Sequence, residues 1–177
     1  MKVYIKDLGA GTIYMDQKSD FWIVAELDNG MIVELFDPEC FARNFEINKI
    51  IDCLILAFYV QDINAVNFEY GHDKEHPILT GRYIGEYTLP NNWVERIKKL
   101  KPKTYSEVQV STSDGQILAN YDKHKKVKEE LHTYPAVQTV NGILLLSFDS
   151  IPKELNIGDI ITFSVGRLDL LAWRPID

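Results

Sequence analysis

Two imidazoles and two carboxylates lie within five residues of one polar stretch, "YGHDKEHP" (residues 70–77). Imidazole nitrogens and carboxylate oxygens are ligands for zinc and similar ions, so this stretch is a candidate metal site. A histidine pair four residues apart aims at one metal reliably only on a helix, whereas the flanking Gly71 and Pro77 indicate a loop. An exposed polar turn is the competing interpretation. The candidate ligands are His72, Asp73, Glu75 and His76.

Aromatic and basic residues in the middle of the chain are candidates for binding single-stranded nucleic acid, which such proteins hold by ring stacking beside a basic groove. Residues 91–128 carry nine basic and four acidic side chains, net +5, although the whole chain has a net charge of −7. The overall acidity disfavours this role, because neutralising phosphates supplies much of the affinity. The candidate residues are Tyr83, Tyr87, Arg96, Lys98, Lys99, Lys101, Lys103, Lys123, Lys125, Lys126 and Lys128.

Other reactive chemistry has little support in the sequence. There is no Gly-x-Ser-x-Gly motif, and "GAG" (residues 9–11) lacks the rest of either nucleotide-binding fingerprint. Two cysteines, Cys40 and Cys53, are too few for a disulfide framework, so we expect free thiols in a reducing compartment and a cytoplasmic location. The sequence predicts no cofactor.

A repeated phrase indicates how the chain is organised. "NGMIVELFD" (29–37) and "NGILLLSFD" (141–149) share their Asn-Gly start and their Phe-Asp end, 112 positions apart. Asn-Gly between runs of apolar and β-branched residues predicts a β-hairpin with a type I′ turn, in which both turn residues have positive φ. Each hairpin leads through a polar connector to a further strand, within 47–60 and 157–171. Either a true duplication or the chance resemblance of two β-meanders explains the repeat.

Alternation of side chains predicts which residues of these later strands are buried. Ile51, Cys53, Ile55, Ala57 and Tyr59 fall on one face, because successive side chains of a strand point to opposite sides. Ile161, Phe163 and Val165 form the corresponding face in the second unit. We expect Ile51, Cys53, Ile55, Ile161 and Phe163 to be buried in a core.

The region between the two units does not repeat their pattern, and the sequence predicts both strands and helices there. A strand spans residues 78–89, with Gly81 and Gly85 indicating a bulge and with Tyr83 and Tyr87 on one face. An amphipathic helix follows at 91–100, with Asn92 as its N-cap. A third hairpin at 105–121 and a second short helix at 122–131 complete this region.

Together these elements predict a mostly-β (β-rich α+β) protein. We expect small barrel- or sandwich-like antiparallel sheets, two related OB- or SH3-like units and two short helices. The units would be an N-terminal one (1–70), a hairpin-and-helix insert (71–132) and a C-terminal one (133–177), with one compact domain as the alternative. The longest apolar run, "IIDCLILAFYV" (50–60), is 11 residues and contains Asp52, so no membrane span is expected.

The functional expectation follows from the scarcity of site chemistry. An acidic β-protein with a segregated charge distribution and no catalytic motif is typical of a non-enzymatic binding protein, with another protein as the partner. A single-stranded nucleic-acid-binding protein and a metal-assisted hydrolase are the two alternatives. The oligomeric state is left open.

Overall fold

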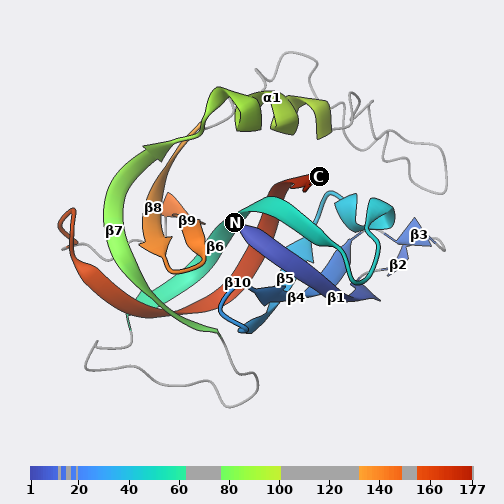
Figure 1. Cartoon of the computed structure of the whole chain (residues 1–177), viewed down its shortest axis with the longest axis horizontal. Coiled ribbons are helices and arrows are strands. Elements are labelled where there is room, and N and C mark those ends of the chain that lie inside the picture. The colour runs from blue at the N-terminus through green and yellow to red at the C-terminus, as the bar shows by residue number, and fades with distance from the viewer. Residues whose placement is uncertain are drawn as a thin grey trace, which may run out of the picture.

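The computed structural model describes residues 1–11, 13–14, 17–18, 20–62, 77–100, 132–148 and 155–176. Strands dominate these residues, which confirms the predicted mostly-β class (Figure 1). The elements are β1 (Lys2–Ala10), β2 (Ile13–Tyr14), β3 (Gln17–Lys18), β4 (Phe21–Leu27), β5 (Ile32–Asp37), a 3₁₀ helix (Phe41–Asn44), β6 (Ile50–Asp62), β7 (Ile78–Thr88), α1 (Asn91–Leu100), β8 (Thr133–Thr139), β9 (Gly142–Leu146) and β10 (Ile160–Pro175). The predicted hairpin at 105–121 and helix at 122–131 lie outside the described residues.

Eight strands form one sheet whose two ends pair back to its middle. The strand order is β1-β4-β5-β10-β6-β9-β8-β7, with additional pairings of β1 with β6 and of β7 with β10. Strands β1, β4, β5, β10 and β6 therefore form one hydrogen-bonded circuit, the first circuit, and β7, β8, β9, β6 and β10 form the second circuit. Both long strands, β6 and β10, belong to both circuits and cross between them in Figure 1.

Most of the pairings are antiparallel, as predicted, but two short ones are parallel. β5 runs parallel to β10, and β9 runs parallel to β6. In each parallel pair, the second strand of a hairpin lies beside the long strand from the other half of the chain. β7 lies in the region that the sequence assigns to an insert, and it pairs with β8 and β10 as a member of the second circuit.

The strand registers of the two circuits match position by position. Seven residue pairs join β1 to β4, from Val3↔Leu27 to Ala10↔Phe21, and seven join β7 to β8, from Gly81↔Thr139 to Thr88↔Thr133. One set maps onto the other when 78 is added to the first number of each pair (81 − 3) and 112 to the second (139 − 27). The register shift also recurs at the matching place, between Ile5 and Asp7 and between Tyr83 and Gly85.

The same correspondence continues at the starts of β6 and β10. Val3 pairs with Ile51 in the first circuit, and Gly81 pairs with Ile161 in the second. The turns that precede these strands both contain a residue with positive φ, Asn48 (68°) and Gly158 (101°). In this conformation Gly is favoured because it has no Cβ to meet the following carbonyl oxygen, and Asn is tolerated because its short polar side chain can form local hydrogen bonds.

The two Asn-Gly hairpins are present, but neither turn is type I′. Gly30 and Gly142 have the predicted positive φ (82° and 118°), whereas Asn29 and Asn141 do not. The first loop has three residues, because the Leu27 N–H donates to the Met31 carbonyl (2.9 Å) across residues 28–30. Such loops place a left-handed glycine after an ordinary turn. The second loop has two residues, since Thr139 pairs directly with Gly142.

The two loops meet each other through the repeated asparagine. The backbone N–H of Asn29 donates to Oδ1 of Asn141 (3.0 Å), and Asn141 is buried. The Asn29 side chain bonds within its own turn, accepting from the Met31 N–H (3.2 Å). Asparagine at these positions is thus used for its amide oxygen as well as its turn-forming backbone.

One hydrophobic core runs through both circuits. It contains Ile51 and Ile55 of β6 and Ile161 and Phe163 of β10, all four buried as predicted, together with Val165 of β10. Its remaining members come from all eight strands of the sheet and from the 3₁₀ helix. The predicted common face of this strand does not extend to Tyr59, whose side chain is 66% exposed. The backbone of Tyr59 has a positive φ of 55°, which breaks the alternation of the strand at this residue.

A second, smaller hydrophobic cluster lies under helix α1. Trp93 and Ile97 of α1 are buried there, as the predicted apolar stripe requires, against Ala136, Leu145 and Ala172 of the sheet. The helix has the predicted bounds, but Asn92 is its second residue and not its N-cap. The Pro90 carbonyl accepts the N–H groups of Trp93 (2.9 Å) and Val94 (3.2 Å) at the helix start.

Candidate functional site

The predicted metal ligands, His72, Asp73, Glu75 and His76, lie outside the described residues. Within the part of the chain that the structure describes, no group of three or more His, Cys, Asp or Glu side chains lies together as a metal site requires. The metal-assisted hydrolase therefore stays a prediction from the sequence alone.

The two tyrosines proposed for nucleic-acid stacking do not share a face. Tyr83 pairs with Val137, and Tyr87 pairs with Tyr134 three positions away, because the bulge at Ile84 inserts an extra residue between the tyrosines. An odd separation places the two side chains on opposite sides of the strand. Tyr83 packs against the main core and Tyr87 against the cluster under α1. The expectation of a common stacking face was wrong.

The basic residues proposed with them are only partly described. On α1, Lys98 pairs with Glu95 (3.1 Å), Lys99 is exposed, and Arg96 is partly buried against the end of β10. The remaining basic candidates, Lys101, Lys103, Lys123, Lys125, Lys126 and Lys128, lie outside the described residues.

Neither cysteine is placed to act as a nucleophile. Both are free thiols, and Cys53 is buried in the core as predicted. Burial raises the pKa of Cys53 to about 12, and burial also raises the pKa of Cys40 against the opposing effect of Arg43. The thiolate is the reactive form of cysteine, and neither thiol has the lowered pKa that activates a nucleophilic cysteine.

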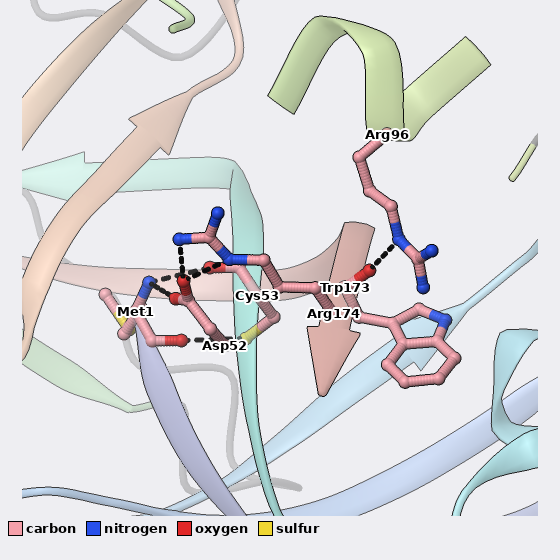
Figure 2. A network of polar contacts seen from close by, with 6 residues as sticks. All are labelled: Met1, Asp52, Cys53, Arg96, Trp173 and Arg174. Carbon is pink, nitrogen blue, oxygen red and sulfur yellow. Dashed lines mark hydrogen bonds and ion pairs between the residues drawn. The ribbon is translucent and has the colours of Figure 1, made fainter. Parts of the chain in front are cut away.

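A charged network connects β1, β6 and β10, and Figure 2 shows it with Asp52 at its centre. One oxygen of Asp52 accepts a bond from the Met1 ammonium (3.0 Å), and the other accepts two from Arg174, at 2.9 Å from Nε and 2.6 Å from Nη2. The Met1 ammonium also donates to the Cys53 carbonyl (2.7 Å). Burial by itself would raise the pKa of Asp52, but the hydrogen bonds from Met1 and Arg174 outweigh burial and lower it.

Helix α1 and the end of β10 exchange arginine–tryptophan contacts. Arg174 of β10 lies over the ring of Trp93 of α1, 4.6 Å from its centroid, and Arg96 of α1 lies over Trp173 of β10 at 5.1 Å. Arg96 Nε also donates to the Trp173 carbonyl (2.7 Å), as Figure 2 shows. We call these four side chains with Met1 and Asp52 the arginine–tryptophan cluster. It has three positive groups and one carboxylate.

A second group of residues runs laterally across neighbouring strands. Trp22 of β4 contacts Phe36 of β5, with ring centroids 5.1 Å apart. Arg167 of β10 lies between Phe36 and Phe58 of β6, 5.0 Å from each ring centroid. We call Trp22, Phe36, Arg167, Phe58 and the neighbouring Tyr59 the aromatic row.

The charge of Arg167 is matched within the sheet. Its guanidinium donates two hydrogen bonds to Asp169, at 2.6 and 2.9 Å. Burial raises the pKa of Asp169, and the hydrogen bonds and charge of Arg167 oppose this shift. The aromatic row therefore presents ring faces and a planar cation without a net positive charge.

Tyr59 is the most exposed member of the aromatic row and the one with unfavourable backbone geometry. A φ of 55° places it in the left-handed region, which costs an aromatic residue about 1–2 kcal/mol relative to an ordinary conformation. Gly166 on the neighbouring strand makes room for it, since a Cβ there would lie 2.9 Å from the Tyr59 Cβ. Strained residues of this kind are concentrated at functional sites.

Sequence reasoning did not identify the aromatic row, because its members come from four strands that are distant in the sequence. Phe36 was visible as part of the repeated "FD" ending of the two hairpins. Its neighbours across the sheet depend on the parallel pairing of β5 with β10, which periodicity within one strand does not indicate. The contacts between arginines and tryptophans could not be predicted either, because they depend on how α1 packs over the end of β10.

Comparisons with known proteins add no family or function. No family model, no curated protein and no solved structure matches the chain. Among the described residues, no helix has the length and apolar character needed to cross a membrane.

Proposed function

We propose that this protein is a non-enzymatic binding protein, that its partner is another protein, and that the aromatic row is the contact surface. The observation that carries this proposal is Tyr59, a 66% exposed aromatic residue held on left-handed backbone in the middle of a strand. Stability alone would favour Asn or Gly at such a position. The tyrosine ring is largely exposed there, and exposed tyrosines are enriched where binding energy concentrates at protein interfaces.

The composition of the aromatic row supports a protein partner. Tryptophan, tyrosine and arginine are the residues most enriched where binding energy concentrates at protein interfaces. The rings of Phe36 and Phe58 also hold the Arg167 side chain in one orientation, so less side-chain entropy is lost on binding. Nucleic acid is the less favoured ligand, since Asp169 neutralises Arg167 and a net positive charge for phosphates is lacking there.

The test replaces Tyr59 by asparagine, which tolerates the left-handed conformation but removes the ring. We expect Tyr59→Asn to change the free energy of unfolding by less than about 1 kcal/mol, because strain relief offsets the lost ring contacts. The wild type and the variant would be used to capture partners from the native host, and the affinity of the captured protein would then be measured. Binding should weaken at least tenfold.

A matched control is Val140→Asn, which replaces another exposed apolar residue (83% exposed) in the β8–β9 loop. This variant should bind the partner as the wild type does. Equal partner affinity of the wild type and Tyr59→Asn would overturn the proposal. Salt-dependent binding of a labelled oligonucleotide, lost in Tyr59→Asn, would replace it by the nucleic-acid alternative.

We also infer that the two circuits are related OB- or SH3-like units that arose by internal duplication. The matching registers of β1–β4 and β7–β8 support this, as do the matching bulges. On this view the predicted N-terminal unit (1–70) and C-terminal unit (133–177) share their long strands, and β7 belongs with the C-terminal unit. A cytoplasmic location is proposed from the two free thiols.

A further inference from the structure

The starting point is the incomplete hydrogen bonding of Arg96. Its Nε donates to the Trp173 carbonyl (2.7 Å) and its guanidinium lies over the Trp173 ring. Within the ranges that the structure describes, its two terminal nitrogens have no acceptor, and no carboxylate forms an ion pair with it. The side chain is partly buried, so its orientation is fixed by packing while its strongest donors stay unused.

A second donor lies beside these nitrogens. The indole Nε1 of Trp173 is buried and has no hydrogen-bond partner among the described residues. Figure 2 shows this nitrogen on the side of the indole that faces the guanidinium of Arg96. A buried donor without a partner costs about 1–3 kcal/mol, and native proteins leave few such groups. The unused Arg96 nitrogens thus lie beside a second unused donor, which is closed to solvent in this structure and which a ligand reaches after a small shift of the side chains that cover it.

The electrostatic surroundings favour an anion in that region. In the arginine–tryptophan cluster the single carboxylate, Asp52, is already shared by Met1 and Arg174, so no carboxylate among the described residues balances the charge of Arg96. Lys99 on the same helix adds a further positive charge nearby in sequence. A guanidinium with fixed orientation is the protein group best suited to bind carboxylate or phosphate oxygens.

We propose that Arg96 and Trp173 form a binding site for an oxoanion, a phosphate or carboxylate group, that accepts hydrogen bonds from the Arg96 terminal nitrogens and from Trp173 Nε1. The site is separate from the aromatic row and does not depend on the function proposed for it. The bound anion would also fasten α1 to the end of β10, because its two donors come from these two elements.

The experiment uses the indole N–H signals of the full chain in ¹H–¹⁵N spectra. The sequence has three tryptophans, and Trp173→Phe assigns the signal of Trp173 by removing it. Inorganic phosphate and acetate are titrated separately at constant ionic strength. We expect the Trp173 signal alone to shift and to saturate, and the anion that gives the tighter saturation identifies the preferred group.

Variants separate the site from general effects of salt. Arg96→Gln should weaken anion binding at least tenfold and abolish the rise in Tm that the anion causes in the wild type. Lys98→Gln, which removes a charge of the same helix that is paired with Glu95, should change the affinity less than threefold. A linear shift without saturation, equal shifts of all three indole signals, or unchanged affinity in Arg96→Gln would each overturn the proposal.

Discussion

Asp52 is the residue on which the charged network depends. Both of its oxygens are used, by the Met1 ammonium and by the Arg174 guanidinium, and its side chain is largely shielded from solvent. Removing the carboxylate leaves two positive groups close together without compensation. Such a loss is more costly than the loss of an exposed ion pair and less costly than that of a fully buried one.

We expect Asp52→Asn to lower the free energy of unfolding by about 1–3 kcal/mol at pH 7. Because the pKa of Asp52 is lowered in the folded protein, its stabilising effect is present above the unfolded pKa of about 4 and is lost as pH falls through the folded value. Urea unfolding of wild type and variant at pH 7, 5 and 3 measures this.

The difference between the two proteins should shrink on acidification. The stability of each protein also depends on Asp37, in the opposite sense. Burial raises the pKa of Asp37, so its charged form costs stability at neutral pH, and this effect cancels in the difference between the two proteins. Glu46→Gln, which breaks an exposed pair with Lys49, serves as a control with little effect. An Asp52→Asn deficit as large at pH 3 as at pH 7 would contradict the assignment.

Asn141 offers a second prediction for a single residue. Its buried Oδ1 is the acceptor for the Asn29 N–H, so Asn141→Ala leaves that backbone donor without its partner. We expect a loss of about 1–2 kcal/mol, measured by chemical unfolding. Asn29→Ala should cost less, since the Asn29 side chain is exposed and bonds only within its own turn. Equal losses in the two variants would argue against the contact between the loops.

At the level of strands and turns, two glycines with positive φ lie in different surroundings. At Gly30 (82°) an added Cβ meets nothing within 4 Å, whereas at Gly85 (75°) it would lie 2.8 Å from Ile157. Gly30→Ala should therefore cost only the backbone strain, about 1–2 kcal/mol. Gly85→Ala should cost more, because the strand bulge there also packs against Ile157.

The double variant Gly85→Ala/Ile157→Ala separates the two contributions at the bulge. Ile157 is 76% exposed, so shortening it should cost little by itself and should relieve the clash. We expect thermal unfolding to show the double variant more stable than Gly85→Ala. If shortening Ile157 brings no recovery, the bulge does not pack as described and backbone strain alone determines the effect.

For the whole molecule, the continuous core predicts that both circuits unfold together. Phe163 is fully buried where β10 belongs to the second circuit. Phe163→Ala should destabilise by about 3–5 kcal/mol. Circular dichroism and tryptophan fluorescence should still give one coincident transition, because Trp22 of β4 reports on the first circuit and Trp93 on the cluster under α1. Two separated transitions would show that the circuits unfold independently.

The sequence predicted the strands and their buried faces because these depend on neighbouring residues. The hairpins at Asn29 and Asn141, the helix at 91–100 and the buried Ile51 and Phe163 all follow from local patterns. The exceptions are places where one residue changes the period, the left-handed Tyr59 and the bulge before Gly85. There the alternation fails, and with it the common face assigned to Tyr83 and Tyr87.

The arrangement of strands and the surfaces it creates could not be read in the same way. The parallel pairing of β5 with β10 joins residues more than a hundred positions apart, and no local signal specifies it. The aromatic row and the contact between Arg96 and Trp173 both depend on such pairings. The metal stretch around His72 was the clearest chemical signal in the sequence, and it lies outside the described residues.

The position of β10 in the sequence has a consequence for how the protein is made. It supplies one wall of each circuit, yet it comes last among the described strands. A ribosome releases β5 and β6 before β10, the strand that lies between them in the sheet, so each of the two carries an open edge until β10 emerges. Such edges are templates for aggregation, and neither circuit can close until β10 has emerged. Translation must therefore pass β10 before either half is safe from misassembly.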